Sequence, residues 1–169
     1  RMRMFNADGS EGEMCGNAIR CVGKYVYDHG ICPKTELVVE TLGGDKYLTL
    51  NVKDGKVFEV TVDMGEPELT SELPEKIHVN GEDREFVGIS VGNPHAVYFT
   101  EEIDGLDLEK IGPAYENHER FPNRVNSEFI ELVSRDHIRM RVWERGSGET
   151  WACGTGATAS AVASILMGY

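Results

Sequence analysis

The sequence predicts an α+β fold built from a duplicated unit, and three observations lead to this prediction. The stretches EGEMCGNA (residues 11–18) and ETWACGTGA (residues 149–157) each place a cysteine directly before a glycine. An apolar segment with helical periodicity follows each cysteine, and several strand-like segments lie between them. The order is therefore loop, Cys-Gly, helix and strands, then strands, loop, Cys-Gly and helix. This order predicts two related halves, each combining a helix with a sheet.

The first helix is expected to start at Cys15. Apolar residues recur after this cysteine at intervals of three and four positions, which is the helical pattern. Gly30 suits the position just past the helix end, and Pro33 prevents a continuation. The apolar residues of this helix are Ala18, Ile19, Val22, Tyr25 and Val26.

An antiparallel meander is expected next, over residues 36–65. Three β-rich segments are separated there by Gly-Gly-Asp and by Lys-Asp-Gly-Lys, and Asp54-Gly55 is a strong hairpin signal. Residues 65–76 contain two prolines and are predicted to be an irregular linker. The predicted domains are therefore residues 1–64 and residues 65–169.

The second half is expected to alternate strands with two helices. Asn80-Gly81 predicts a hairpin, a strand follows the Gly-Asn-Pro-His stretch, and two more strands flank residues 134–136. Residues 106–118 predict a helix that is interrupted near Gly112-Pro113. The last helix starts at Gly154. Its apolar residues are Ala157, Ala161, Val162, Ile165 and Leu166.

Composition and charge narrow the classes of function. The chain has 169 residues, a net charge of -12 and a pI near 4.8, which argues against binding to nucleic acid or to an anionic membrane surface. Residues 150–169 are uncharged, but they are rich in Gly, Ala, Ser and Thr, so a buried helix is favoured over a membrane span. The four cysteines form neither a disulfide ladder nor a CxxC pair, which predicts reduced thiols, no metal site and a cytoplasmic location.

The two Cys-Gly corners predict acid–base chemistry by thiols. Unpaired N–H groups and the positive dipole end at a helix start favour thiolate, so the pKa values of Cys15 and Cys153 are expected to be lowered. Inverting a stereocentre needs a base on one face of a carbon and an acid on the other, which two such thiols supply. A redox disulfide pair is the alternative. Cys21 and Cys32 are expected to be ordinary small hydrophobic residues.

Several stretches together resemble the diaminopimelate epimerase family, the cofactor-independent epimerases of lysine and peptidoglycan-precursor biosynthesis. The stretches are FNADGSEGEMCGNAIRC, VDMGEP, VGNPHAV, ENHERFPNRVN, RVWERGSGET and ACGTGA, and they run along the whole chain in the family's order. The resemblance implies two homologous domains. Each wraps a mostly antiparallel, curved sheet around a central apolar helix, and the active site lies in the cleft between them. It implies no metal and no organic cofactor.

The resemblance also implies roles for individual residues. Cys15 and Cys153 would be the two-base pair that converts LL-diaminopimelate to meso-diaminopimelate, and His95 would tune the catalytic site. Glu144 would hold a substrate ammonium, and Arg145 would pair with the distal carboxylate. The backbone N–H groups implied to bind the reacting carboxylate belong to Gly16, Asn17, Gly154 and Thr155. The side chains implied to bind the distal end of the substrate are Asn6, Asn93 and Asn126.

Three alternatives stay open. Proline racemases and hydroxyproline epimerases share the two-cysteine logic, but they have histidine where this chain has Asn17. Relatives that isomerise phenazine precursors share the fold but lack the paired cysteines. An inactive binding fragment is the third alternative. The family extends beyond both ends of this chain, so the chain is expected to be truncated and, alone, unstable or inactive. The sequence does not fix the oligomeric state, and a homodimer stays open.

Overall fold

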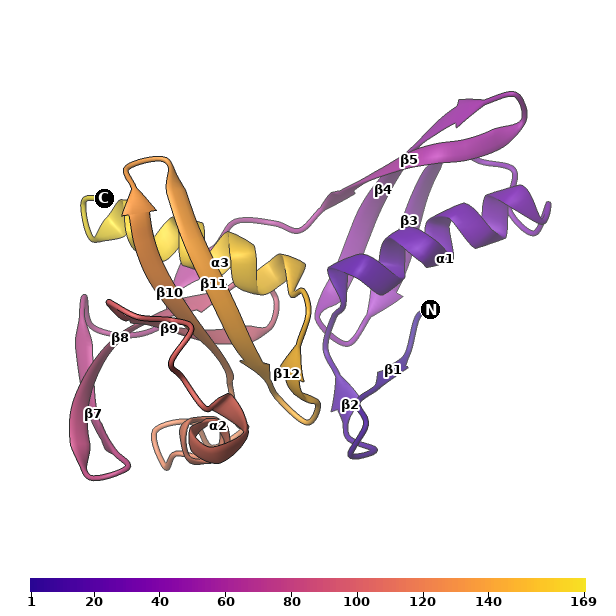
Figure 1. Cartoon of the computed structure of the whole chain (residues 1–169). Coiled ribbons are helices and arrows are strands. Elements are labelled where there is room, and N and C mark those ends of the chain that lie inside the picture. Colours follow the sequence, from indigo (N-terminus) through magenta and orange to yellow (C-terminus); the bar gives the residue numbers. More distant parts are fainter.

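The computed structural model describes residues 1–169 and contains two main sheets, each accompanied by a long helix (Figure 1). The predicted α+β class is confirmed. The division into domains at residue 65 stays a prediction. The elements before that position are the short pair β1 and β2, helix α1, and strands β3, β4 and β5. Their bounds are Met4–Phe5, Glu11–Gly12, Gly16–Asp28, Glu36–Thr41, Gly44–Lys53 and Lys56–Asp63.

The predicted meander is confirmed as a three-stranded antiparallel sheet in the order β3-β4-β5. At its second turn, Asp54 has φ 52° and Gly55 has φ 75°, the left-handed conformation that an Asp-Gly hairpin turn requires. Helix α1 packs on this sheet through the fully buried Ile19. A side chain at Gly23 would place its Cβ 2.8 Å from a Leu48 methyl carbon, so glycine is what lets the helix lie this close.

The end of α1 is also as predicted. Gly30 has φ 69° and donates its N–H to the Tyr27 carbonyl at 2.9 Å, while Ile31 donates to Val26 at 2.9 Å. These two bonds are the glycine-terminated helix end that satisfies the last carbonyls. Tyr25, placed by periodicity on the apolar face, is 55% exposed. The sheet covers only one side of α1, which leaves this ring in solvent.

The second sheet has seven strands, in the order β12-β11-β10-β9-β8-β6 with β7 paired to β8. All neighbours are antiparallel except β9 and β10, which run parallel and are joined by a crossover that contains α2. The strand bounds are Glu68–Leu69 (β6), Glu75–Val79 (β7), Glu82–Ser90 (β8), Pro94–Phe99 (β9), Asn126–Ser134 (β10), His137–Glu144 (β11) and Gly148–Thr150 (β12). The helices are Leu108–Glu116 (α2) and Gly154–Leu166 (α3).

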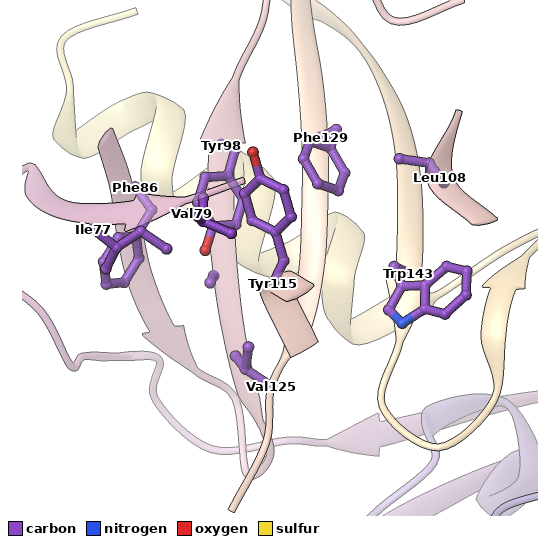
Figure 2. Close-up of a cluster of buried hydrophobic side chains, with 10 residues drawn as sticks. Ile77, Val79, Phe86, Tyr98, Leu108, Tyr115, Val125, Phe129 and Trp143 are labelled. Carbon is purple, nitrogen blue, oxygen red and sulfur yellow. The ribbon is translucent and has the colours of Figure 1, made fainter. Parts of the chain in front are cut away.

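The two faces of this sheet carry different cores. The face toward α2 holds an aromatic cluster, in which Phe129 stacks on Tyr98 with ring centroids 5.4 Å apart and meets Tyr115 edge-on at 5.1 Å (Figure 2). The face toward α3 is aliphatic, with Val97 and Ile130 fully buried. Adjacent residues of one strand thus serve opposite layers, as the alternation of side chains along a strand requires.

Two predictions about the second half are corrected by the structure. Helix α2 is not interrupted near Gly112-Pro113. The helix continues through Pro113, which is exposed. Gly112 lies where a Cβ would be 2.3 Å from the Trp143 ring, so glycine allows the helix to pack this close. The predicted linker is not irregular throughout, because β6 pairs with β8 inside it and β7 begins at Glu75.

Of the apolar residues predicted for the last helix, only Val162 packs against the aliphatic core. Ala157, Ala161 and Ile165 are exposed, and the small residues Ala159 and Ala163 face the sheet instead. Small side chains let the helix approach the strands closely, which a row of larger residues would prevent. The prediction of a buried helix therefore holds for one face only. No helix of this chain is long and apolar enough to cross a membrane.

Candidate active site

A pocket of about 280 Å³ lies between the first residues of α1 and the first residues of α3, and it contains both predicted catalytic cysteines. We call it the cysteine pocket. The predicted site residues that line it are Asn6, Cys15, Gly16, Asn17, Asn93, Asn126, Glu144, Arg145, Cys153, Gly154 and Thr155. His95 is the exception, because it is buried behind Asn93 and does not line the pocket. A cavity of about 420 Å³ on the α2 side of the second sheet contains none of these residues.

The two cysteines occupy equivalent positions, since each is the N-cap of its helix. Cys15 has φ -137° and ψ 109°, and Cys153 has φ -129° and ψ 108°. The Cys15 Sγ accepts the Ala18 N–H at 3.5 Å, and the Cys153 Sγ accepts the Gly156 N–H at 3.3 Å. Helices α1 and α3 point these ends toward each other (Figure 1). The matched corners seen in the sequence thus lie on opposite sides of one pocket.

The helix starts also supply donors for an anion. The first N–H groups of an α-helix have no partner within the helix, and they lie at its positive end. Gly16 and Asn17 begin α1, and Gly154 and Thr155 begin α3, all of them lining the pocket. The pocket therefore offers two sets of unpaired amides to a carboxylate group.

Burial sets the protonation of Cys153. It raises the pKa of this thiol to about 12, against the opposing effect of hydrogen bonds from the Thr155 hydroxyl and the Gly156 N–H, while Glu144 and Glu128 add to the rise. The expected lowering of the Cys153 pKa is therefore wrong for this side chain, because loss of water outweighs the helix end. The raised pKa means that Cys153 is a protonated thiol at neutral pH.

The alkylation rate of Cys153 is expected to follow this raised pKa. Since only thiolate reacts, its rate with iodoacetamide should rise about tenfold for each unit of pH between about pH 8 and about pH 10. Peptide mass spectrometry gives the rate at each cysteine, and the exposed Cys21 is the internal reference. A plateau for Cys153 below about pH 9 would contradict the burial argument.

Arg145 is anchored rather than solvated. Its side chain is 10% exposed, and its guanidinium forms an ion pair with the Glu13 carboxylate, which belongs to the loop before α1. It also donates to the Asn123 carbonyl at 3.2 Å, and the backbone N–H of Arg145 donates to Asn126 Oδ1 at 2.9 Å. The predicted carboxylate-binding arginine therefore already holds a carboxylate in this structure.

Three of the predicted polar side chains already have hydrogen-bond partners within the chain. Glu144 accepts a hydrogen bond from the Thr150 hydroxyl. Asn126 donates to the Pro94 carbonyl at 2.9 Å, and Asn6 donates to the Ser10 hydroxyl at 3.1 Å. These contacts orient the side chains and leave parts of them facing the pocket that they line.

Sequence reasoning missed two carboxylates of this region. Glu13 stands in the sequence only as part of the first motif, although it pairs with Arg145, a residue that lines the pocket. Glu128 is fully buried on β10, where its Oε1 lies 2.7 Å from His95 Nδ1. A signal for Glu128 did exist, because a charged residue beside the Phe-Ile pair of a buried strand is rare without a partner.

The chain matches the family model described as diaminopimelate epimerase over residues 1–70 and 87–169. A diaminopimelate epimerase of Desulfovibrio desulfuricans is 55% identical over 186 residues, and one of Methanococcus maripaludis is 53% identical over 180 residues. Each match covers 100% of this chain and 65% of the relative. The chain thus spans a little under two thirds of the length of these curated relatives.

Solved structures agree on the fold. A probable proline racemase from Agrobacterium radiobacter superposes with a TM-score of 0.71 at 16% identity, covering 95% of this chain and 55% of that one. A hydroxyproline epimerase from Agrobacterium vitis gives a TM-score of 0.70 at 19% identity, covering 95% of this chain and 54% of that one. At such identities the likeness concerns the fold alone.

Proposed function

Because the chain belongs to the diaminopimelate epimerase family, we propose that its cysteine pocket inverts the α-carbon of LL-diaminopimelate to give meso-diaminopimelate. The observation that carries this proposal is the pair of N-cap cysteines lining one pocket from opposite helices. The reaction would serve lysine and peptidoglycan-precursor biosynthesis. It needs no organic cofactor and no metal in this proposal, since two thiols are enough to move the proton.

Proton transfer follows from the two sulfur positions. The Cys15 thiolate takes the α-hydrogen, so that a C–H bond breaks and an S–H bond forms. Cys153, a thiol at neutral pH, gives its proton to the opposite face of the carbon and becomes a thiolate. The negative charge that develops on the substrate moves onto its α-carboxylate, next to the unpaired amides of the helix starts. In the reverse direction the two cysteines exchange roles.

The rest of the pocket suits a substrate with a second amino-acid end. Arg145 holds the Glu13 carboxylate in this structure, so a distal substrate carboxylate would compete for the same guanidinium. Glu144 would attract a substrate ammonium, and Asn6, Asn93 and Asn126 would supply amide groups. Proline has no second carboxylate that could bind the Arg145 guanidinium. A carboxylate-binding arginine in the pocket therefore favours diaminopimelate over the substrates of the proline racemase relatives. Binding of the small molecule alone, assembly as a homodimer and a cytoplasmic location stay predictions.

Solvent deuterium tests the proposed reaction. LL-Diaminopimelate is incubated with the 169-residue chain in D₂O, and mass spectrometry with chiral chromatography follows the label and the meso product. The same assay is run on a chimera in which these residues replace the matching stretch of the Desulfovibrio relative. We expect at least the chimera to give meso product that carries one deuterium. L-Proline, incubated in the same way as a control, should take up no deuterium. An unlabelled, unreacted substrate in both samples would refute the proposal.

A further inference from the structure

A chain of four hydrogen bonds connects the buried Glu128 to the sulfur of Cys153. Glu128 Oε1 lies 2.7 Å from His95 Nδ1, and His95 Nε2 lies 3.0 Å from Asn93 Oδ1. The Asn93 amide then donates from Nδ2 to the Thr155 hydroxyl at 3.2 Å, and that hydroxyl lies 3.5 Å from Cys153 Sγ. The chain begins behind the cysteine pocket and ends at one of its two thiols.

Both ring nitrogens of His95 face oxygen atoms that accept hydrogen bonds. A carboxylate oxygen stands at Nδ1 and an amide oxygen at Nε2. Both oxygens accept a hydrogen bond from the ring when each nitrogen carries a proton, which makes the ring an imidazolium beside a carboxylate. A protonated Glu128 would instead donate to Nδ1 and leave a neutral ring with its proton at Nε2. The side chains of His95 and Glu128 are both 0% exposed, so the carboxylate is the charge that balances the ring.

The charge on the ring sets the direction of every later bond. An N–H at Nε2 fixes the Asn93 amide with its oxygen toward the ring and its NH₂ toward Thr155. The Thr155 oxygen thus accepts a hydrogen bond, which leaves its own hydrogen free to point at Cys153 Sγ. With a neutral ring bare at Nε2, the amide would turn over. The hydroxyl would then donate to Asn93 and withdraw its hydrogen from the sulfur.

We propose that Glu128 is a positioning residue for Cys153, because it holds His95 as an imidazolium and so directs the Thr155 hydroxyl hydrogen onto the sulfur. This hydrogen bond stabilises the thiolate that Cys153 becomes after it gives up its proton. The inference deepens the proposed epimerase function by naming what supports the second thiol. Its evidence is the geometry of the chain, which does not depend on the substrate.

Other groups around the sulfur also affect its ionisation. Glu144, from β11, and Glu128, from β10, oppose ionisation of Cys153, whereas the Gly156 N–H of α3 favours it. Cys15 lies on the other side of the pocket. The pair of Glu128 and His95 has no net charge when both are ionised, and its replacement by a neutral pair leaves the net charge unchanged. A neutral residue at position 128 reverses the hydrogen bonds when the ring then keeps its proton at Nδ1 and loses the one at Nε2.

Glu128 lies very close to the start of α3, and Gly156 makes room for it. A Cβ at Gly156 would lie 2.6 Å from Glu128 Oε1 and 3.2 Å from Cys153 Sγ. Glycine at this position is what allows the carboxylate and the thiol to share the start of the helix. The second oxygen, Oε2, is buried and has no hydrogen-bond partner, so the ion pair with His95 is the main contact of this side chain.

The first test reads the charge of His95 directly and needs no substrate. In the ¹⁵N NMR spectrum of the 169-residue chain near neutral pH, both ring nitrogens of His95 should show the shifts of protonated nitrogen. In Glu128→Gln, Nε2 should shift to the value of a bare, unprotonated ring nitrogen. A bare Nδ1 beside a protonated Nε2 would overturn the proposal, because the direction of the chain would then not depend on Glu128. A neutral His95 in the unmutated chain would overturn the proposal, and so would a ring that stays doubly protonated in Glu128→Gln.

The second test is a double-mutant cycle on the alkylation rate of Cys153 at one fixed pH. Losing the hydrogen bond to the thiolate lowers the fraction of Cys153 that is ionised. Glu128→Gln and Thr155→Val should therefore each slow alkylation about tenfold or more. The double variant should be no slower than Thr155→Val alone, because the hydroxyl is the last link. Thr155→Ser should keep most of the rate. Glu131→Gln, the same change on the half-buried part of β10 away from the cysteine pocket, should not alter it.

Additive losses in the double variant would overturn the proposal, since they would mean that Glu128 acts on the sulfur without the hydroxyl. Faster alkylation in Glu128→Gln would also overturn it, because simple removal of a negative charge would then dominate. Neither readout requires turnover. Failure of the deuterium assay would therefore leave this inference standing, and failure here would leave the epimerase proposal standing.

Discussion

Replacing Cys15 or Cys153 by serine is expected to lower the rate of epimerisation at least about a hundredfold, because each variant loses one of the two proton-transfer groups. A serine hydroxyl is far less acidic than a thiol and does not form an anion at neutral pH. The remaining cysteine has no partner on the other face of the carbon, so inversion stops even where one proton can still move. The rate is measured as meso product formed from LL-diaminopimelate by the chimera described above.

The chain supplies its own matched controls for this prediction. Cys21 is exposed on α1 and Cys32 is half-buried after it, and neither lines the cysteine pocket. Cys21→Ser and Cys32→Ser should therefore keep nearly the full rate. If either Cys15→Ser or Cys153→Ser epimerised as fast as these controls, the assignment of two bases would be wrong.

Replacing Phe129 by alanine is expected to cost about 3–5 kcal/mol of the free energy of unfolding, the range for removing a buried phenylalanine ring. Phe129 is 3% exposed and contacts the rings of both Tyr98 and Tyr115 in the aromatic core (Figure 2). Its loss removes apolar burial, leaves a cavity and breaks two aromatic contacts. Urea unfolding followed by circular dichroism measures the change.

Val133 gives the control for the core substitution. It lies on the same strand as Phe129 but is 49% exposed, so Val133→Ala should cost less than about 1 kcal/mol. A similar loss of stability in both variants would mean that the strand, and not the packed ring, accounts for the effect. A stability unchanged in Phe129→Ala would contradict the aromatic core itself.

Much of the fold could be predicted because local signals decide it. Asp54-Gly55 and Asn80-Gly81 set hairpin turns by their backbone preferences alone, and both turns form where expected. The helix end at Gly30 follows from the same kind of local preference. The exposed face of α3 could not be predicted in this way. Which side of an uncharged helix of small residues faces the sheet depends on how closely those residues let it pack, and that is a property of the assembled layers.

For the site as well, features set by the local sequence could be predicted, and features that depend on folding could not. Cys15 and Cys153 were predicted because each sits in a local corner, and the structure places both in one pocket. The raised pKa of Cys153 was not predictable, since it comes from the burial of α3 against the second sheet. Glu13 and Glu128 were missed because their partners, Arg145 and His95, lie far away in sequence and meet them only after folding.

The parallel alignment of β9 and β10 has a consequence for how the chain reaches its folded state. It places His95 beside Asn126 and Val97 beside Glu128, and it cannot form until the long crossover through α2 has closed. Closing such a loop has an entropic cost that a hairpin avoids, so pairings of this kind form slowly. The hairpins are therefore expected to form first, and the ends of the strands that support Cys153 come together among the last steps of folding.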